Sequence, residues 1–333
     1  MWLFFFFFIK YIGDDMNSLI GNTPLIKIKY EYNNKIKDIY TKLEYYNLTG
    51  SIKDRMADFI IKEAYKNKLL VKGQAIIEAT SGNTGISLAS IGAFYHNPVY
   101  IFMPDWVSSE RKKIMEMYGA TVTLISKEEG GFKRCIEEAN LLASKINGFR
   151  VNQFSNPNNL LAHFQTTGVE IINKLKKVDG FVSGIGTGGT LMGTASKIKE
   201  VNNNLVVCAV EPKELPILKD KNSIGSHKID GIGDDFIPEL VNRDKIDVIY
   251  DISDEDAINM SRLLSSKLGL GVGISSGCNF LGSVLLNEEL DGNIVTVFPD
   301  DNKKYLSTDL SKGINKDEKL ISNKIKLISY EIV

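Results

Sequence analysis

The sequence predicts an α/β protein with largely parallel sheets. Short apolar runs alternate along the chain with segments of helical period, which is typical of this class. Two glycine-rich turns, at 80–85 and 184–190, each follow an apolar run and open a helical segment. Because open parallel sheets bind ligands at the carboxyl ends of their strands, both turns indicate a ligand site. The expected strands are 38–43, 74–78, 99–103, 121–125, 180–183, 205–211 and 293–298, and the expected helices are 51–66, 84–94, 109–118, 132–146, 168–175, 189–201, 254–268 and 279–286.

Composition indicates a small-molecule partner. The chain has 333 residues, of which 43% are hydrophobic and 24% charged, enough for two domains or one large one. Its 40 basic and 41 acidic residues leave a net charge of −1, so no basic field is available for nucleic acid or anionic lipid. The three cysteines and three histidines form no disulfide or metal pattern, and we expect no metal and a reducing cytoplasm.

The first nine residues, MWLFFFFFI, are apolar but far short of the ~20 residues that span a bilayer. No basic segment precedes them and no small-residue cleavage site follows, which argues against a signal peptide. We expect Met16 to be the true start and residues 1–15 to be an extension or a disordered tail. A peripheral membrane anchor is the alternative.

The turn at 184–190 reads GIGTGGT and supports two interpretations. It matches the dinucleotide fingerprint GxGxxG, and Glu211 stands 22 positions after Gly189, where a ribose-binding acid is expected. In either case small residues let the amides of a helix N-terminus approach a phosphate. Thr187 and Thr190 add hydroxyl donors, which suit a terminal phosphate better than a bridging pyrophosphate.

The turn at 80–85 reads TSGNTG and describes a second anion site at a helix start. Such a site fits an amino-acid carboxylate, for which a nicotinamide dehydrogenase has no need. Lys53, in the segment GSIKDR, stands near the start of an otherwise apolar helix. Partial burial there would lower its pKa and favour a Schiff base, although a surface lysine fits the same pattern. One lysine and two anion sites together favour pyridoxal phosphate as cofactor.

Several segments carry a family resemblance over about residues 17–310. In order they are KLEYYNLTGSIKDR, EATSGNTG, GIGTGGTLMGT, AVEP, GIGDDFIP, GISSG and KYLST. Their order and spacing resemble the cysteine synthase (O-acetylserine sulfhydrylase) and cystathionine β-synthase family. The resemblance disfavours the dinucleotide interpretation and implies the tryptophan synthase β-like fold (fold type II), pyridoxal 5'-phosphate as cofactor, and a homodimer.

The resemblance also implies domains and site residues. A small mobile domain would span 50–150, a large cofactor-binding domain 16–49 plus 151–310, and a tail 311–333 would pack on the surface or extend a dimer contact. Lys53 would bind the cofactor aldehyde and later move the α-proton, and Asn83 would contact the ring hydroxyl. The phosphate would be held by Gly186, Thr187, Gly188, Gly189 and Thr190, and the substrate carboxylate by Thr80, Ser81, Thr84 and Gln153.

Two departures from the family pattern concern aspartates. Asp301 stands where a cysteine synthase has a serine of a Ser-Ser-Gly segment, and we expect its carboxylate to contact the pyridine nitrogen, with a solvent-facing Asp301 as the alternative. Asp234 stands where those enzymes have a small residue. We hypothesise that Asp234 acts as a general base for water or a thiol and repels anionic sulfide. The competing interpretation is that Asp234 and Asp235 are solvated on a surface turn.

The sequence therefore predicts β-replacement on a serine- or cysteine-type amino acid, by default O-acetylserine plus sulfide giving cysteine plus acetate. The alternatives are a cysteine lyase that releases hydrogen sulfide, a lanthionine or cystathionine-type synthase, and a dehydratase of the same fold. A catalytically idle member that binds a regulator is disfavoured by intact Lys53 and Asn83. Some cysteine synthases bind the C-terminal tail of serine acetyltransferase, and this is a candidate partner.

Overall fold

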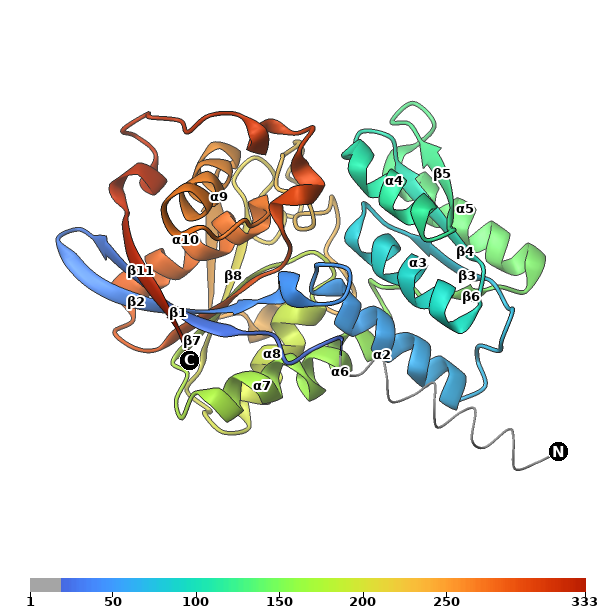
Figure 1. Cartoon of the computed structure of the whole chain (residues 1–333), viewed down its shortest axis with the longest axis horizontal. Helices are drawn as coiled ribbons and strands as arrows, with labels where there is room; N and C mark the ends of the chain where they lie inside the picture. Colours follow the sequence, from blue (N-terminus) through green and yellow to red (C-terminus); the bar gives the residue numbers. More distant parts are fainter. Residues whose placement is uncertain (1–18) are drawn as a thin grey trace.

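The computed structural model describes residues 19–333, which form two lobes built on separate sheets (Figure 1). The expectations for residues 1–15, and for Met16 as the start, fall outside the described residues. No helix among residues 19–333 is long and apolar enough to cross a membrane.

The large lobe contains a seven-stranded sheet in the order β11-β1-β2-β10-β7-β8-β9. The outer strands β11, β1 and β2 pair antiparallel, and every pairing from β2 to β9 is parallel. The parallel part therefore directs the carboxyl ends of its strands to one edge, where α/β sheets bind ligands. The strands are β1 (Leu25–Tyr32), β2 (Lys35–Leu43), β7 (Gly180–Gly184), β8 (Val206–Pro212), β9 (Val248–Ile252), β10 (Ile294–Phe298) and β11 (Lys326–Ile332).

The small lobe contains a four-stranded parallel sheet in the order β5-β4-β3-β6. Helix α2 (Lys53–Lys66) precedes this sheet in the chain and packs its buried side against the small-lobe core (Figure 1). The strands are β3 (Ile76–Ala79), β4 (Val99–Pro104), β5 (Thr121–Ile125) and β6 (Phe149–Arg150).

Helices cover the sheets, and short 3-10 turns connect several elements. The α-helices are α2 (Lys53–Lys66), α3 (Asn83–Tyr95), α4 (Ser109–Met117), α5 (Gly131–Ile146), α6 (Pro157–Gln165), α7 (Thr167–Lys174), α8 (Gly189–Lys199), α9 (Asp254–Leu268) and α10 (Ile274–Glu289). The 3-10 turns are η2 (Glu44–Tyr46), η3 (Arg243–Lys245), η4 (Asn302–Tyr305), η5 (Asp309–Ser311) and η6 (Ile321–Lys324).

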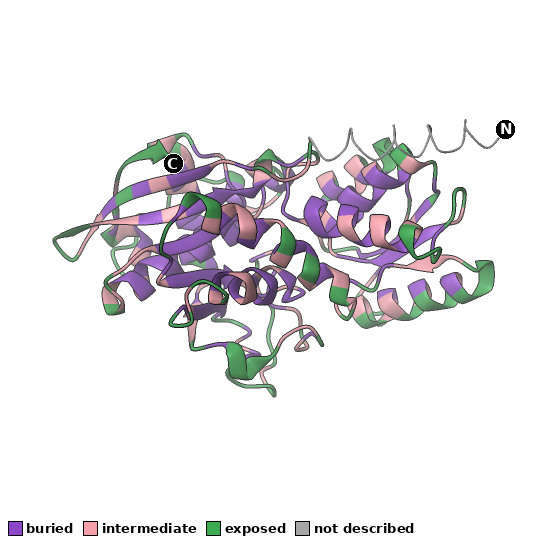
Figure 2. Cartoon of the chain, turned by 90° about the horizontal axis from the view of Figure 1, so that it is seen from below, coloured by how far each residue is buried: buried purple, intermediate pink, exposed green. Residues whose placement is uncertain are grey.

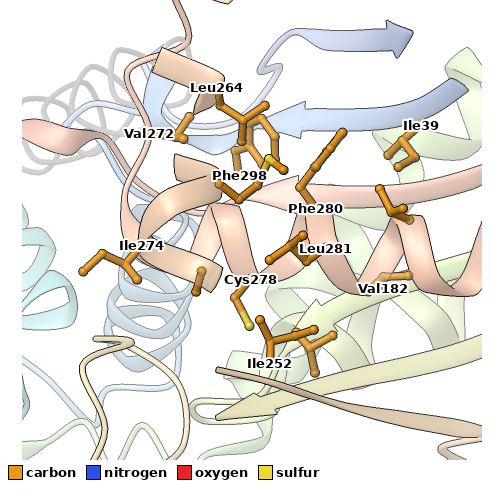
Figure 3. Close-up of a cluster of buried hydrophobic side chains, with 14 of the residues drawn as sticks. Ile39, Val182, Ile252, Leu264, Val272, Ile274, Cys278, Phe280, Leu281 and Phe298 are labelled. Atoms are coloured by element: carbon orange, nitrogen blue, oxygen red, sulfur yellow. The ribbon is translucent and has the colours of Figure 1, made fainter. Parts of the chain in front are cut away.

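The central strands and most of α10 are buried, and Figure 2 shows the strands in the middle of the molecule largely in purple, the colour of buried residues. Strand β10 has the sequence IVTVF, and each of its residues is buried, as is typical of parallel strands covered on both faces. On one face of the large sheet, Phe280 of α10 packs edge-on against Phe298 with ring centroids 6.4 Å apart (Figure 3). Cys278 points into the same cluster beside Leu281. This packing fixes the sheet edge at which the site lies.

The structure confirms the predicted α/β fold with largely parallel sheets and adds elements that the sequence patterns did not indicate. Strand β1 was missed because lysines interrupt its apolar positions, and α6 because a proline and two asparagines break its pattern. Residues 326–332 form β11, which pairs with β1 and extends the large sheet. The segment 311–333 therefore contributes an edge strand to the large lobe.

Candidate active site

Lys53 is the first residue of α2 and stands where the two lobes meet. The preceding residues join the large sheet's edge: Ile52 N–H donates to the Pro299 carbonyl at 2.8 Å, and Ser51 pairs with Asp300. Lys53 lines two adjoining pockets. The outer pocket lies at the first glycine turn, and a more enclosed one, here called the deeper pocket, lies at the second. Burial lowers the pKa of Lys53, and the negative charges of Asp300 and Asp234 oppose part of that shift. A lysine amine with a lowered pKa in a pocket is suited to bind a carbonyl group.

The second glycine turn joins β7 to α8 and forms the wall of the deeper pocket. The helix begins at Gly189 with no side-chain cap, so amides of its first turn are left for a ligand. Glycine is required here for space: a Cβ on Gly186 would lie 2.4 Å from the Gly231 carbonyl oxygen, and one on Gly189 would lie 2.0 Å from Asn159. Asn159 donates to the Thr187 hydroxyl at 2.9 Å.

The remaining members of this turn also face the deeper pocket. Gly188 adopts a φ of +86°, which lets the chain turn into the helix. The Thr190 hydroxyl lies 3.3 Å from His163 Nε2, and the His163 ring also contacts the Thr167 hydroxyl at 3.0 Å. His163 is buried, and its burial lowers its pKa to about 3, so the ring is neutral at physiological pH. A neutral imidazole at this position orients the Thr190 hydroxyl without adding charge.

The first glycine turn joins β3 to α3 and forms the wall of the outer pocket. Thr80, Ser81, Thr84 and Gln153 all line this pocket. Gln153 is nearly fully buried, accepts from the Thr84 hydroxyl at 2.6 Å and donates to the Ala79 carbonyl at 2.9 Å. Helix α3 also begins without a side-chain cap. The four predicted carboxylate-binding residues are thus gathered around one uncapped helix start.

Asn83, the first residue of α3, lines both pockets. Its side-chain amide donates to Asp300 Oδ2 at 2.8 Å, and its Oδ1 atom is buried without a hydrogen-bond partner. Asp300 is fully buried and also accepts from the Tyr305 hydroxyl at 2.7 Å. A polar atom left unpaired at a pocket wall marks a place where a ligand group completes the hydrogen bonding.

Neither Asp300 nor Asp301 is among the residues that line the two pockets, and the contact of Asp301 with the pyridine nitrogen stays a prediction. The segment is extended here, with Asp300 and Asp301 bridged to neighbours on opposite sides, so one residue step reverses the side chain's direction. Asp300 points inward, whereas Asp301 caps η4 by accepting from Lys303 N–H at 3.2 Å. The sequence interpretation also missed Ser275, a buried hydroxyl on the wall of the deeper pocket. The sequence signal that could have identified Ser275 is the segment GISSG, which contains it.

Asp234 lies at the outer pocket together with Lys53 and is partly buried, whereas its neighbour Asp235 is exposed. Burial, together with the negative charge of Asp235, raises the pKa of Asp234 to about 6, and the charges of His227 and Lys53 oppose this shift. A carboxyl with a pKa near the working pH of an enzyme can accept and return a proton.

The turn that carries Asp234 is held at several points. Gly233 N–H donates to the Ile185 carbonyl at 2.9 Å, next to the second glycine turn. His227 Nε2 donates to the Gly233 carbonyl at 2.6 Å, and its Nδ1 lies 3.2 Å from Ile229 N. A Cβ on Gly233, which has a φ of +74°, would collide with Pro212 and His227.

The donor set fits pyridoxal phosphate. A lysine of lowered pKa, an unpaired Asn83 Oδ1 and a glycine turn that excludes Cβ atoms surround adjoining pockets that share these residues. The turn at 186–190 would hold the phosphate, Lys53 the aldehyde, and Asn83 the ring hydroxyl. The fold and these residues are typical of a lysine-dependent enzyme, in which the turn at 186–190 would hold a phosphate and the turn at 80–85 a carboxylate.

Comparison with known proteins identifies the family. The family model for pyridoxal-phosphate dependent enzymes matches residues 16–300, so the chain belongs to that family and uses pyridoxal phosphate. This confirms the resemblance and the fold type inferred from the sequence motifs.

Similar proteins include cysteine synthases and hydrogen sulfide-producing enzymes. Cysteine synthase B of Campylobacter jejuni is 42% identical over 302 residues, which cover 90% of this chain and 99% of that protein. A cysteine synthase of Staphylococcus aureus is 36% identical, covering 89% and 96%. The crystal structure of a hydrogen sulfide-producing enzyme from Fusobacterium nucleatum matches with a TM-score of 0.93 and 45% identity, over 97% of this chain and 99% of that one. An Asp-to-Asn mutant of such an enzyme, in complex with an alpha-aminoacrylate intermediate, matches with a TM-score of 0.94.

Proposed function

We propose that this enzyme catalyses β-replacement on a cysteine-type amino acid with water as the nucleophile, converting L-cysteine and water to L-serine and hydrogen sulfide. The C–S bond at the β-carbon breaks and a C–O bond forms there. The observation that carries the proposal is the position of Asp234, a carboxyl with a raised pKa on the same pocket wall as Lys53. The similarity to hydrogen sulfide-producing enzymes supports it.

Each residue has a distinct part in this reaction. Pyridoxal phosphate, when bound, supplies an electron sink for charge at the substrate α-carbon. Thr80, Ser81, Thr84 and Gln153 hold the substrate carboxylate at the start of α3. The Lys53 amine removes the α-proton of the substrate. Asp234, ionised above pH 6, accepts a proton from the attacking water, and its negative charge disfavours anionic sulfide at the same place.

Cysteine synthesis from O-acetylserine and sulfide is the second candidate. It is supported by 42% identity to cysteine synthase B over nearly the whole of both chains. Both reactions use the same lysine, phosphate turn and carboxylate site. They differ in the leaving group and the nucleophile, which single contacts worth ~1–3 kcal/mol can decide.

A product assay separates the two candidates. Purified enzyme with pyridoxal phosphate receives cysteine alone in one reaction and O-acetylserine plus sulfide in another, and cysteine, serine, lanthionine, pyruvate and sulfide are quantified. We expect serine and sulfide in equal amounts from cysteine. Efficient cysteine formation with little sulfide release would establish a biosynthetic cysteine synthase, and stoichiometric lanthionine would establish a thioether-forming enzyme.

The role of Asp234 is tested by Asp234→Asn, with Asp220→Asn as a control at an exposed aspartate. We expect the Asp234 variant to lose serine formation from cysteine by at least about 100-fold, the scale of general base catalysis. Unchanged sulfide release and serine formation would contradict the role of Asp234.

We also propose that the enzyme works as a cytoplasmic homodimer whose small lobe closes over the substrate. Dimers are expected from the family, and three buried free cysteines suit a reducing compartment. Light scattering of the purified protein tests the dimer. A peptide from a serine acetyltransferase C-terminus, added in competition with substrate, tests whether this enzyme takes that partner.

A further inference from the structure

Arg111 on α4 is a buried cation of the small lobe that reaches the large lobe. Its side chain is only 2% exposed, although α4 itself is largely solvent-facing. Nη1 donates to Asp230 Oδ2 at 2.6 Å and to the Ser108 hydroxyl at 3.2 Å. The guanidinium also lies over the Tyr305 ring, 4.7 Å from its centroid. The ion pair, the hydrogen bond and the aromatic ring hold the guanidinium in one position, and such contacts are stronger for a buried arginine than for one at the surface.

The same side chain passes directly over the first glycine turn. A Cβ placed on Gly82 would lie 2.1 Å from Arg111 Cδ and 2.6 Å from its Nε, so the aliphatic part of Arg111 occupies the space that glycine leaves. Gly82 stands between Ser81 and Asn83, both on the pocket wall. If the turn that receives the substrate carboxylate shifted toward α4, Gly82 would therefore press against the Arg111 side chain.

At its other end, Arg111 holds the turn that carries Asp234. Asp230 immediately precedes residues 231–235, and Gly231, with a φ of +90°, links it to that turn. Interactions around Arg111 reinforce this contact between lobes: the Ser108 hydroxyl donates to the Lys304 carbonyl at 2.7 Å, and Glu110 accepts from Ser307 N–H at 2.8 Å.

We propose that Arg111, paired with Asp230, is a positioning residue that couples the carboxylate-binding turn to the turn bearing Asp234. Substrate carboxylate bound at 80–85 fixes Gly82, Gly82 fixes Arg111, and Arg111 holds Asp230 so that Asp234 faces the β-carbon. The inference deepens the proposed function and rests on it for the role of Asp234. Its consequence is that the nucleophile is delivered only when a substrate carboxylate is in place.

Loss of this coupling has a specific chemical signature. A substrate that loses its sulfur and receives no nucleophile leaves as pyruvate and ammonia: cysteine plus water gives pyruvate, ammonia and hydrogen sulfide. The productive reaction consumes the same cysteine and water but gives serine and hydrogen sulfide. The ratio of serine to pyruvate thus reports how well Asp234 is positioned. It does not depend on how much of the enzyme is folded or loaded with cofactor.

The test compares Arg111→Lys and Asp230→Asn with Lys112→Gln and Asp220→Asn, which replace neighbouring or similar side chains outside the site. We expect the serine-to-pyruvate ratio to fall about tenfold in each of the first two variants, since misplacement of a reacting group by about 1 Å carries penalties of this order or more. The double variant should show the same ratio as either single variant, because both remove one coupling. The two controls should keep the wild-type ratio.

An unchanged ratio in both Arg111→Lys and Asp230→Asn would overturn the proposal, even if their activity or melting temperature falls. That result would assign Arg111 a structural role alone. The outcome is separable from the proposed function. A wild-type enzyme that makes no serine from cysteine would overturn the proposed function, whereas serine formation by wild type with an unchanged ratio in both variants would overturn the coupling alone.

Discussion

Arg55, two residues beyond Lys53, forms a buried ion pair with Glu44. Arg55 Nε lies 2.6 Å from Glu44 Oε2, and both side chains are at most 1% exposed. Arg55 is also paired with Glu170, at 2.6 Å through Nη1, and Glu44 accepts from the Thr23 hydroxyl at 2.7 Å. The network joins α2 to the start of the large lobe and to α7. It therefore fixes the helix whose first residue is Lys53.

Replacing Glu44 by glutamine should destabilise the enzyme strongly. The change leaves the Arg55 charge buried with one partner fewer, and breaking a buried pair in this way costs ~3–5 kcal/mol. The free energy of unfolding in urea measures the loss. Lys66→Gln, which breaks an exposed pair with Glu63, is the matched control and should cost less than ~1 kcal/mol. A Glu44→Gln loss no greater than that of the control would mean that the pair does not hold α2.

This pair also predicts acid sensitivity. Burial alone would raise the pKa of Glu44, but the Arg55 charge and hydrogen bonds, with Lys42, lower it to about 2 from an ordinary value of 4.5. A carboxyl with a lowered pKa in the folded state stabilises the protein above its unfolded pKa, and this contribution fades as pH falls from 4.5 toward 2. Unfolding titrations should show a smaller loss of stability across this range in Glu44→Gln than in wild type.

Gly186→Ala should reduce affinity for pyridoxal phosphate. The added Cβ would lie 2.4 Å from the Gly231 carbonyl oxygen, and backbone on that side cannot withdraw as a flexible side chain can. The turn must then shift, and its phosphate-facing amides shift with it. We expect at least about a tenfold loss of affinity, worth about 1.4 kcal/mol, by fluorescence titration of the apoenzyme. Gly313→Ala, where an added Cβ meets nothing, is the control. Equal affinities in the two variants would contradict the assignment.

The parts of this site that follow local chain geometry could be predicted from the sequence. Both glycine turns stand between an apolar strand and a helix, so their place at the sheet edge follows from α/β topology. Lys53 was identified from its place near the start of a helix in the segment GSIKDR, whereas the role of Asn83 came from the family resemblance. The strand within 311–333 could not be predicted, because β11 is an exposed edge strand whose partner β1 is about three hundred residues away.

Side-chain direction and long-range pairing could not be predicted from the sequence. Asp300 and Asp301 are adjacent and chemically identical, and only the bridge between Ser51 and Asp300 decides which of them points inward. The pairing of Arg111 with Asp230 joins residues 119 positions apart and leaves no local pattern. Ser275 was inside a recognised segment, but its exposure to the pocket depends on the start of α10.

Asp300→Asn should weaken cofactor binding through Asn83. The variant loses the charge that accepts from the Asn83 amide at 2.8 Å, and hydrogen bonds to charged groups contribute ~1.5–3 kcal/mol. We expect about tenfold weaker binding of pyridoxal phosphate to the apoenzyme and an altered absorption spectrum of the holoenzyme. Asp301→Asn, one residue along, should match wild type in both. If Asp301→Asn produced the larger effect, the inward assignment of Asp300 would be wrong.

The pH dependence of serine formation should follow Asp234. Burial and Asp235 raise its pKa to about 6, and a general base acts only when ionised, so kcat/KM should rise as pH increases through 6 and then level off. Removing the Asp235 charge with Asp235→Asn takes away the second cause of the raised pKa, so the acid limb should move to lower pH. Lys53 and His227 act in the opposite direction, and His227→Gln should move the limb to higher pH. The measurement is a pH profile of serine release for the three proteins. An acid limb that stays in place in both variants would assign it to a group other than Asp234.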